Sequence, residues 1–505
     1  MTSKLAVKIA AHPLAKAGFL AAWLGCASLA AAADEDQTIA ERHRALLQAN
    51  AVALEALADW CEQNGLTDQA AGTRDWIVPQ APLTLVLALP PSVNDTTKQI
   101  TPDDDPPLVQ QWRQQFVELR QAQADRLFEL ALVAAETREF TAAYQLIHEV
   151  LRENPDHERA RLLLGYKQHD GRWRTQYEIS KAQAQQVWHP RFGWLPENQV
   201  ARYESGERRY RGRWVSAADE TASRANLERG WDVVTEHYQV RTNHSLESGV
   251  RLAERLERFY GAWRQVFARF VMNDDQWDRL FRDGAPTGAP KRHQVVLYRN
   301  RGEFIQALER EQPSIRISTG YYSPKSRKAF YFAGSEEDDS TLYHEAAHQL
   351  FAETRPTSRD AGRDSNFWIV EGVACWIESF RPADGLAMIG GVDALRLRNA
   401  RTRLVRDRFY QPLGQLAAMS VVDVQTSPQI SMLYSESAGL TYFLMYAGEG
   451  RYREPLVAFL NAVYARRDKP STMAELTGVD FHELDRQYRE FIEGLPDPEP
   501  TETEP

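Results

Sequence analysis

Cysteine is scarce in this chain, with only three residues in 505. A framework of disulfides, which small secreted domains use in place of a large core, is therefore excluded. A basic surplus is also missing, because 60 lysines and arginines face 70 aspartates and glutamates, giving a formal net charge of −10. Since a general nucleic-acid binder carries an excess of positive charge, we expect no nucleic acid among the partners.

Long hydrophobic runs are missing too, except near the N-terminus. There, residues 17–33 carry no charge, follow three lysines and end in three alanines. This pattern predicts a secretory signal peptide over residues 1–33 and a secreted or periplasmic protein. A membrane anchor is disfavoured because the stretch is short and rich in alanine, so we expect no stable membrane span after cleavage. Lipidation at Cys26 is a weaker alternative, since Trp23 stands where leucine is expected.

Removal of the signal peptide leaves Cys61 and Cys375. The two could pair in an oxidising compartment, but two small buried thiols are the favoured interpretation.

The remaining composition is that of an ordinary folded protein, with 43% hydrophobic and 26% charged residues, and its length predicts two to four domains. Residues 34–169 form a predicted helical region. Apolar residues recur every three or four positions from Thr38 to about Gly72, with a break at Asn64-Gly65. Residues 79–107, rich in proline and aspartate, predict a linker or a short strand within the apolar run 83–89.

Residues 126–165 carry small and large apolar residues in an order that resembles a tetratricopeptide repeat, with Pro155 at the expected break. Only one and a half repeats are present, and an independent solenoid needs about three. We therefore expect a helical hairpin packed on a neighbouring part of the chain, with a possible surface for a protein partner.

A second internal similarity follows in residues 170–232. Residues 170–175 and 211–216 both contain Gly-Arg-Trp, and both precede a helical stretch. Glycine followed by tryptophan predicts a tight turn into a short strand, so we expect Trp173 and Trp214 to be structural residues of a small module. A sugar-binding aromatic platform is the weaker alternative.

From about residue 233 the pattern mixes helices and strands. Residues 238–242, 293–298 and 329–333 read as strands, and Ser245 is a predicted cap for the helix after the first of them. Residues 436–495 read as helical, and the acidic, proline-rich tail 496–505 is predicted to be disordered. The expected fold class is α+β.

The residues with the clearest chemistry follow the third strand, where His344-Glu345-Ala346-Ala347-His348 forms an H-E-x-x-H motif. On a helix, positions four apart lie on one face, so both imidazoles can reach one metal ion. Glu345 lies beside them and is a candidate general base. Catalytic zinc needs a third protein ligand, and Glu371 is the candidate because a charge inside an apolar run is costly unless it is paired or metal-bound.

With W-x-x-E-G-x-A following H-E-x-x-H, the sequence resembles the gluzincin superfamily of zinc metallopeptidases. Residues 233–495 are most similar to exported, uncharacterised bacterial proteins assigned to that superfamily. The resemblance implies a zincin-type domain over 233–495, Zn²⁺ held by His344, His348 and Glu371, and Glu345 as the general base. It also implies a peptide or protein substrate. The gap between His348 and Glu371 is longer than in thermolysin, so the loop 353–366 must differ.

Other site residues are less certain from sequence. Tyr434 is the best candidate for the oxyanion donor that the resemblance implies, with Tyr442 and Tyr446 as competitors. Glu378 either orients a ligand histidine or is a solvated charge, and Cys375 is expected to pack near the site without binding metal. The strand 330–333 is either the sheet edge that binds an extended peptide or an ordinary core strand.

The resulting expectation is an exported zinc-dependent metallopeptidase. Two alternatives stay open: a non-catalytic envelope scaffold that retains the peptidase fold, and a zinc hydrolase acting on another bond.

Overall fold

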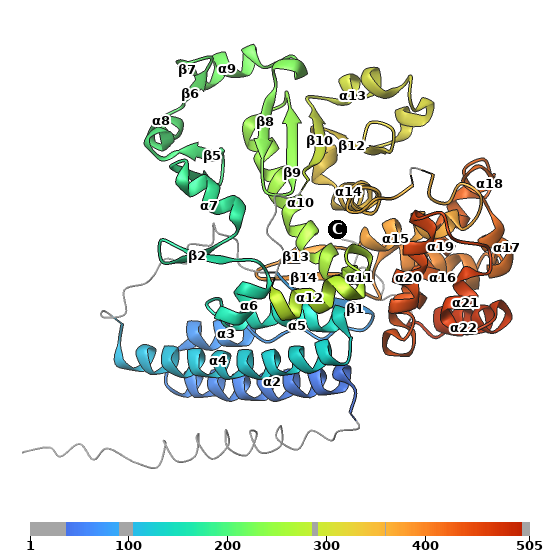
Figure 1. Cartoon of the computed structure of the whole chain (residues 1–505), viewed down its shortest axis with the longest axis horizontal. Helices are drawn as coiled ribbons and strands as arrows, with labels where there is room; N and C mark the ends of the chain where they lie inside the picture. Colours follow the sequence, from blue (N-terminus) through green and yellow to red (C-terminus); the bar gives the residue numbers. More distant parts are fainter. Residues whose placement is uncertain (1–36, 90–104, 285–290, 359, 497–505) are drawn as a thin grey trace, which may run out of the picture.

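The computed structural model describes residues 37–89, 105–284, 291–358 and 360–496. Helices and strands both contribute to it, as the α+β expectation requires (Figure 1). The predicted signal peptide and all but the first residue of the predicted disordered tail lie outside these residues. Within them, no helix combines the length and the apolar character needed to cross a membrane.

The N-terminal region is built from helices, drawn in blue and teal in Figure 1. Thr38 caps the start of the first helix, because its side chain and that of Glu41 form a capping box, and Asn64 caps its end. Two of the helices, residues 107–136 and 140–153, pack against each other as a pair, and the first begins at Pro107, well before Arg126. The helices of this region are α2 (Ile39–Gln63), α3 (Thr67–Asp75), α4 (Pro107–Glu136), α5 (Phe140–Glu153) and α6 (Glu158–Leu163).

The apolar run 83–89 contains a strand that connects the N-terminal region with the C-terminal part of the chain. β1 (Thr84–Ala88) pairs antiparallel with β14 (Leu386–Gly390), and β13 (Arg381–Ala383) completes a three-stranded sheet. Leu87 and Leu89 are buried in the main core. The helical region is therefore not an independent unit joined by a linker.

The Gly-Arg-Trp module contains three units, each a β-hairpin followed by a helix. In the first and third, Asp170-Gly171 and Arg211-Gly212 have positive φ at both positions, as a two-residue type I′ hairpin requires. The middle unit has a longer turn and no Gly-Arg-Trp, so sequence similarity reveals only two units. The units are β2 (Lys167–His169), β3 (Arg172–Arg174) and α7 (Gln176–Gln183); β4 (Gln186–His189), β5 (Gly193–Pro196) and α8 (Val200–Glu204); β6 (Glu207–Tyr210), β7 (Arg213–Ser216) and α9 (Ala217–Ser223).

A five-stranded sheet follows, in the order β11-β12-β10-β9-β8. Its three inner strands are parallel, and both outer strands run antiparallel to their neighbours. The strands are β8 (Trp231–Val234), β9 (Tyr238–Thr242), β10 (His293–Tyr298), β11 (Tyr321–Ser323) and β12 (Lys328–Phe332). Three of them match the predicted strands.

Of the two alternatives for residues 330–333, the structure excludes the sheet edge and supports the inner core strand. β12 pairs with β10 on one side and with β11 on the other, with Phe330 opposite Tyr321. The edge strand on this side of the sheet is β11, and β8 is the edge strand on the other side. The three residues of β11 are too few to show the alternation that identifies a strand in a sequence.

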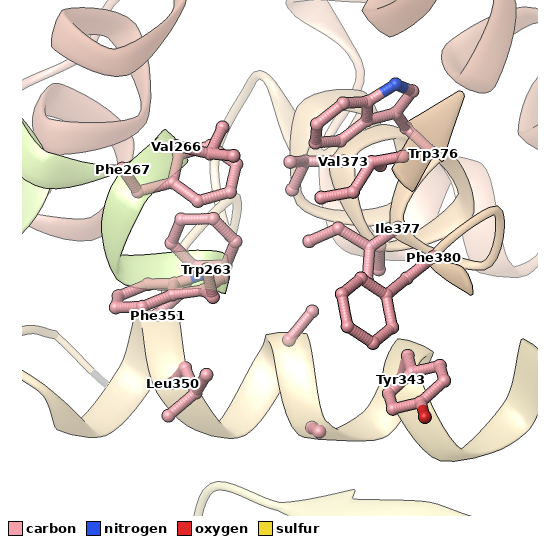
Figure 2. Close-up of a cluster of buried hydrophobic side chains, with 14 of the residues drawn as sticks. Trp263, Val266, Phe267, Tyr343, Leu350, Phe351, Val373, Trp376, Ile377 and Phe380 are labelled. Atoms are coloured by element: carbon pink, nitrogen blue, oxygen red, sulfur yellow. The ribbon is translucent and has the colours of Figure 1, made fainter. Parts of the chain in front are cut away.

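Helices cover the sheet and form the rest of the C-terminal part. α10 (Leu246–Val266) begins at the predicted cap Ser245 and packs against α14 (Asp339–Glu353). Figure 2 shows the apolar contact of α10 and α14 with α15 (Phe367–Ile377), in which Trp263, Phe351 and Trp376 take part. The remaining helices are α11 (Ala268–Val271), α12 (Asp274–Asp283), α13 (Arg301–Leu308), α16 (Leu395–Val405), α17 (Leu413–Ala418), α18 (Val421–Gln425), α19 (Ile430–Tyr446), α20 (Arg453–Tyr464), α21 (Thr472–Thr477) and α22 (Phe481–Glu493).

Candidate metal centre

The H-E-x-x-H motif lies on α14, which begins where the sequence predicts. The Asp338 side chain accepts a hydrogen bond from the amide of Ser340 and caps the helix. Alanines and leucines on one face of α14 are fully buried against the core. His344, Glu345 and His348 lie on the other face and stay partly accessible. The motif is therefore held by core packing while its polar groups remain available to a ligand.

Glu371 reaches the same place from α15. Every residue of this helix is buried, and Glu371 itself is 8% exposed. Gly372 allows α19 to pack closely, because a Cβ on it would lie 2.5 Å from the carbonyl oxygen of Ser437. The glycine after the acidic residue thus brings α15 and α19 into direct backbone contact.

Three potential ligand atoms converge between α14 and α15. The Nε2 atoms of His344 and His348 are 3.1 Å apart, and the Glu371 carboxylate oxygen Oε2 lies 3.5 and 3.7 Å from them. Burial raises the pKa of the Glu371 carboxyl, but the two histidines outweigh burial and lower it below its ordinary value. The carboxylate therefore remains charged, and the three side chains can hold one metal ion.

Glu378 fixes the orientation of His344. Its Oε1 accepts a hydrogen bond from His344 Nδ1 at 2.9 Å, which leaves Nε2 free to face Glu371. Arg396 on α16 donates to both oxygens of Glu378, at 2.7 and 2.8 Å. Burial alone would raise the pKa of Glu378. His344 and Arg396 outweigh burial, so the pKa lies below its ordinary value and the carboxyl stays ionised. Glu378 is therefore a residue that orients His344 and not a solvated charge on the helix surface.

Cys375 lies one turn after Glu371 and is fully buried. A second group of potential ligand atoms lies within 4.8 Å of one another and consists of one atom each from Cys375, His344 and Glu378. Glu378 contacts Nδ1 of the His344 ring, whereas Glu371 faces Nε2. Burial raises the pKa of the thiol, so it stays protonated beside His344. Cys61 is also buried, and both cysteines are free thiols, as expected.

Glu345 does not join the three converging atoms. Its Oε2 accepts a hydrogen bond from the backbone amide of Tyr322 on β11 at 2.7 Å. Gly320 lies directly against it, since a Cβ there would meet the Glu345 Cγ at 3.1 Å. The edge strand thus holds one oxygen of Glu345 and leaves Oε1 without a hydrogen-bond donor among the described residues.

Tyr434 on α19 interacts with two charged groups of the centre, Glu371 and Glu345. Burial and the neighbouring Glu371 carboxylate raise its pKa well above the ordinary value, so its hydroxyl stays protonated. Tyr446 instead donates to the carbonyl of Ile389 at 2.7 Å, and Tyr442 is fully buried in the core. Tyr434 lies one turn inside α19, which begins at Ile430.

Sequence reasoning missed two groups of the centre, Arg396 and the Tyr322 amide. Arg396 belongs to a run of alternating leucines and arginines with no motif, and a backbone amide carries no residue-specific signal. Both reach the centre only through tertiary contacts.

Comparison with known protein families gives a match to part of the chain. A family described as "Protein of unknown function (DUF1570)" matches residues 338–470. This segment begins at the cap of α14 and includes both histidines, Glu345, Glu371 and Tyr434. No curated protein matches the chain.

Proposed function

We propose that this chain is an exported zinc-dependent metallopeptidase of the gluzincin type. The observation that carries the proposal is the convergence of His344 Nε2, His348 Nε2 and Glu371 Oε2, separated by 3.1 to 3.7 Å. Around tetrahedral zinc with bonds of about 2.0–2.1 Å, neighbouring ligand atoms are about 3.3–3.4 Å apart. The three side chains therefore fit zinc in both type and spacing.

The groups around the ligands support the same assignment. The hydrogen bond from His344 Nδ1 to Glu378 selects the tautomer whose Nε2 lone pair can bind metal. Two imidazoles and one carboxylate are the ligand set of thermolysin-type catalytic zinc, which keeps a further position open for substrate or water. Zinc, when bound, supplies a Lewis acid that polarises a carbonyl group and lowers the pKa of water.

The residues of the chain carry the proton transfers. Glu345 Oε1 takes a proton from the attacking water and returns it to the leaving amine, while the Tyr322 amide holds Oε2. The protonated Tyr434 hydroxyl donates a hydrogen bond to the oxygen that becomes negatively charged.

A peptide is the favoured substrate because the edge strand lies beside the base. The Tyr322 amide points from β11 towards Glu345, and an extended chain added along this edge would pass the same carboxylate. Export rests on the signal-like pattern of residues 1–33.

The test is cleavage of an unbiased peptide mixture, with zinc content measured on every preparation. Glu345→Gln should keep its zinc and lose activity by about 10²–10⁴-fold, the usual contribution of a general base. Tyr434→Phe should lose about 10²–10³-fold, because it removes one hydrogen bond to the oxyanion.

His348→Ala is the control for the metal, since loss of one of three ligands should remove the zinc. Equal zinc in this variant and wild type would contradict the ligand assignment. A wild-type protein that binds zinc but cleaves no peptide would favour the scaffold alternative, and an active Glu345→Gln protein would refute the mechanism.

A further inference from the structure

The segment that joins α14 to α15 is attached to a part of the chain about 100 residues further on, between α20 and α21 (at the right in Figure 1). The Ser358 amide donates a hydrogen bond to the Tyr464 carbonyl at 2.8 Å, and Asp364 forms an ion pair with Arg466. Both histidines of the metal centre precede this segment and Glu371 follows it. Contacts that fix the segment therefore bear on the spacing of the three side chains.

Asn366, the last residue of the segment, has an unusual backbone conformation. Its φ is 55° and its ψ is 25°, in the left-handed region that asparagine adopts more readily than most residues. The residue is fully buried and lies directly before α15. An asparagine at this place ordinarily caps the helix, yet its side chain makes no bond to the first amides of α15. The side chain therefore has another role.

Carbonyl groups at the end of α17 take the place of a side-chain cap. The Asn366 backbone amide donates to the Ala417 carbonyl at 2.9 Å, and the Phe367 amide donates to the Met419 carbonyl at 3.4 Å. These bonds satisfy backbone donors that the start of a helix leaves without an intrahelical partner. The Asn366 side chain can consequently point away from its own helix.

The side chain of Asn366 acts as a hydrogen-bond donor. Its Nδ2 donates to Asp468 Oδ2 at 2.8 Å and to the Lys469 carbonyl oxygen at 2.9 Å, and the Ser365 hydroxyl donates to the same Asp468 oxygen at 3.1 Å. The Oδ1 of Asn366 is buried and has no partner among the described residues. The position thus calls for an N–H donor on a left-handed residue, which neither glycine nor aspartate supplies.

Glu371 is close enough to Asn366 for this anchor to affect it. It follows by five residues, which is about 7.5 Å along a helix, and every residue of α15 between them is buried. A shift at the start of the helix is therefore passed on to the carboxylate. The close packing at Gly372 restrains the helix against α19, and Asn366 restrains its start.

We propose that Asn366 is a positioning residue of the metal centre, which sets the distance from Glu371 to the two histidines by tying the start of α15 to Asp468 and Lys469. The inference rests on the proposed zinc site. Asn366 touches none of the three ligand side chains, so its effect is exerted through α15. If core packing alone positioned α15, loss of these hydrogen bonds would reduce stability and leave metal binding unchanged.

The test is the zinc affinity of the full chain, measured by competition with a chelator. Asn366→Gly keeps the left-handed backbone without strain and removes only the side-chain bonds. Asn366→Asp keeps the size of the side chain but places an acceptor against Asp468. Each should weaken zinc binding by at least about 10-fold, the scale of loss when residues that support metal ligands are changed.

Asp364→Asn is the matched control. Asp364 lies two residues before Asn366 in the same segment, and its side chain is 71% exposed. Its ion pair with Arg466 is therefore a surface pair of small energetic weight. This variant should bind zinc like wild type.

Two further measurements separate positioning from stability. In the double variant Asn366→Asp/Asp468→Asn the donor moves to position 468, which restores the hydrogen bond in the opposite direction. It should bind zinc at least about 5-fold more tightly than Asn366→Asp, because a hydrogen bond to a charged group is regained. With cobalt(II) in place of zinc, the visible absorption spectrum reports ligand geometry and should change in both single variants but not in the control.

All affinities are measured well below the melting temperature of the least stable variant. The proposal is refuted if both single variants bind zinc like wild type, if their cobalt spectra are unchanged, or if the double variant recovers no affinity, whatever the melting temperatures are. Should Asn366→Asp fail to fold, Asn366→Gly alone decides. A wild-type protein that binds neither metal would refute the proposed zinc site and this role with it, so wild type alone distinguishes the two failures.

Discussion

A single methyl group at Gly372, next to Glu371, should disturb the packing of α15 against α19. In Gly372→Ala the added Cβ would lie 2.5 Å from the Ser437 carbonyl oxygen and 2.7 Å from the Thr441 hydroxyl. An ordinary contact needs at least 3.4 Å, so α15 and α19 must separate by nearly 1 Å. Neither helix can move freely, because all of α15 and most of α19 are buried.

The free energy of unfolding should fall as a result. Overpacking costs about 1–3 kcal/mol, and the better helix propensity of alanine returns up to about 1 kcal/mol. We expect a net loss of about 1–2 kcal/mol, which for a domain of this size lowers the melting temperature by roughly 2–8 °C. Differential scanning calorimetry measures the shift.

Gly72→Ala is the matched control with the opposite expected sign. Gly72 also lies in a helix, but it is exposed and a Cβ there would meet no atom within 4 Å. This variant should be more stable than wild type by about 0.5–1 kcal/mol. If Gly372→Ala melts at or above the wild-type temperature, the close contact of α15 and α19 is refuted.

The remaining predictions concern zinc affinity, the hairpin module and pH. Glu378→Ala should weaken zinc binding by about 10–100-fold, as measured by competition with a chelator, because His344 loses its orienting partner; unchanged affinity would contradict that role. Trp214→Ala should reduce stability in thermal unfolding by about 1–3 kcal/mol, since the ring packs edge to face on Tyr203; equal stability with lost binding of cell-wall material would refute the packing role. Burial raises the pKa of Glu436 from 4.5 to about 8, so the folded protein keeps a proton that the unfolded chain loses, and stability should fall as pH rises between these values. Glu436→Gln should remove that part of the pH dependence, and an identical stability profile would refute it.

Local rules allow part of the fold to be predicted. The strands at 238–242 and 293–298 and the caps at Ser245 and Asp338 depend on residues close in sequence. The two histidines proposed as ligands can also be predicted locally, because four-residue spacing places them on one face of a helix. Glu371 was detectable since it is the one charge in an apolar helix.

Features that depend on distant segments could not be read in this way. The pairing of β1 with β14 joins residues about 300 positions apart, and the sequence of neither strand identifies the strand with which it pairs. The edge strand β11 is too short to carry a periodic pattern, and Arg396 reaches Glu378 from a different helix. Sequence similarity does not reveal the middle hairpin unit, because its turn has no Gly-Arg-Trp. Most of these features depend on contacts between residues that are far apart in the sequence, whereas a recognisable pattern extends over only a few neighbouring residues.

The helix that carries the H-E-x-x-H motif is fixed at both ends as well as along its buried face. At its start, Asp339 forms a salt bridge with Arg255 of α10. At its end, Glu353 accepts hydrogen bonds from His293 Nδ1 at 3.0 Å and from the Tyr322 hydroxyl at 3.2 Å.

This anchoring explains why three ligand atoms can stand 3.1 to 3.7 Å apart through the protein's own packing. If zinc binds as proposed, a centre held in this way would lose little conformational entropy on binding, so more of the coordination energy would appear as affinity. The same reasoning explains the position of Tyr322. Its hydroxyl fixes the end of α14 and its amide fixes Glu345, so one edge-strand residue positions both the helix and the proposed base.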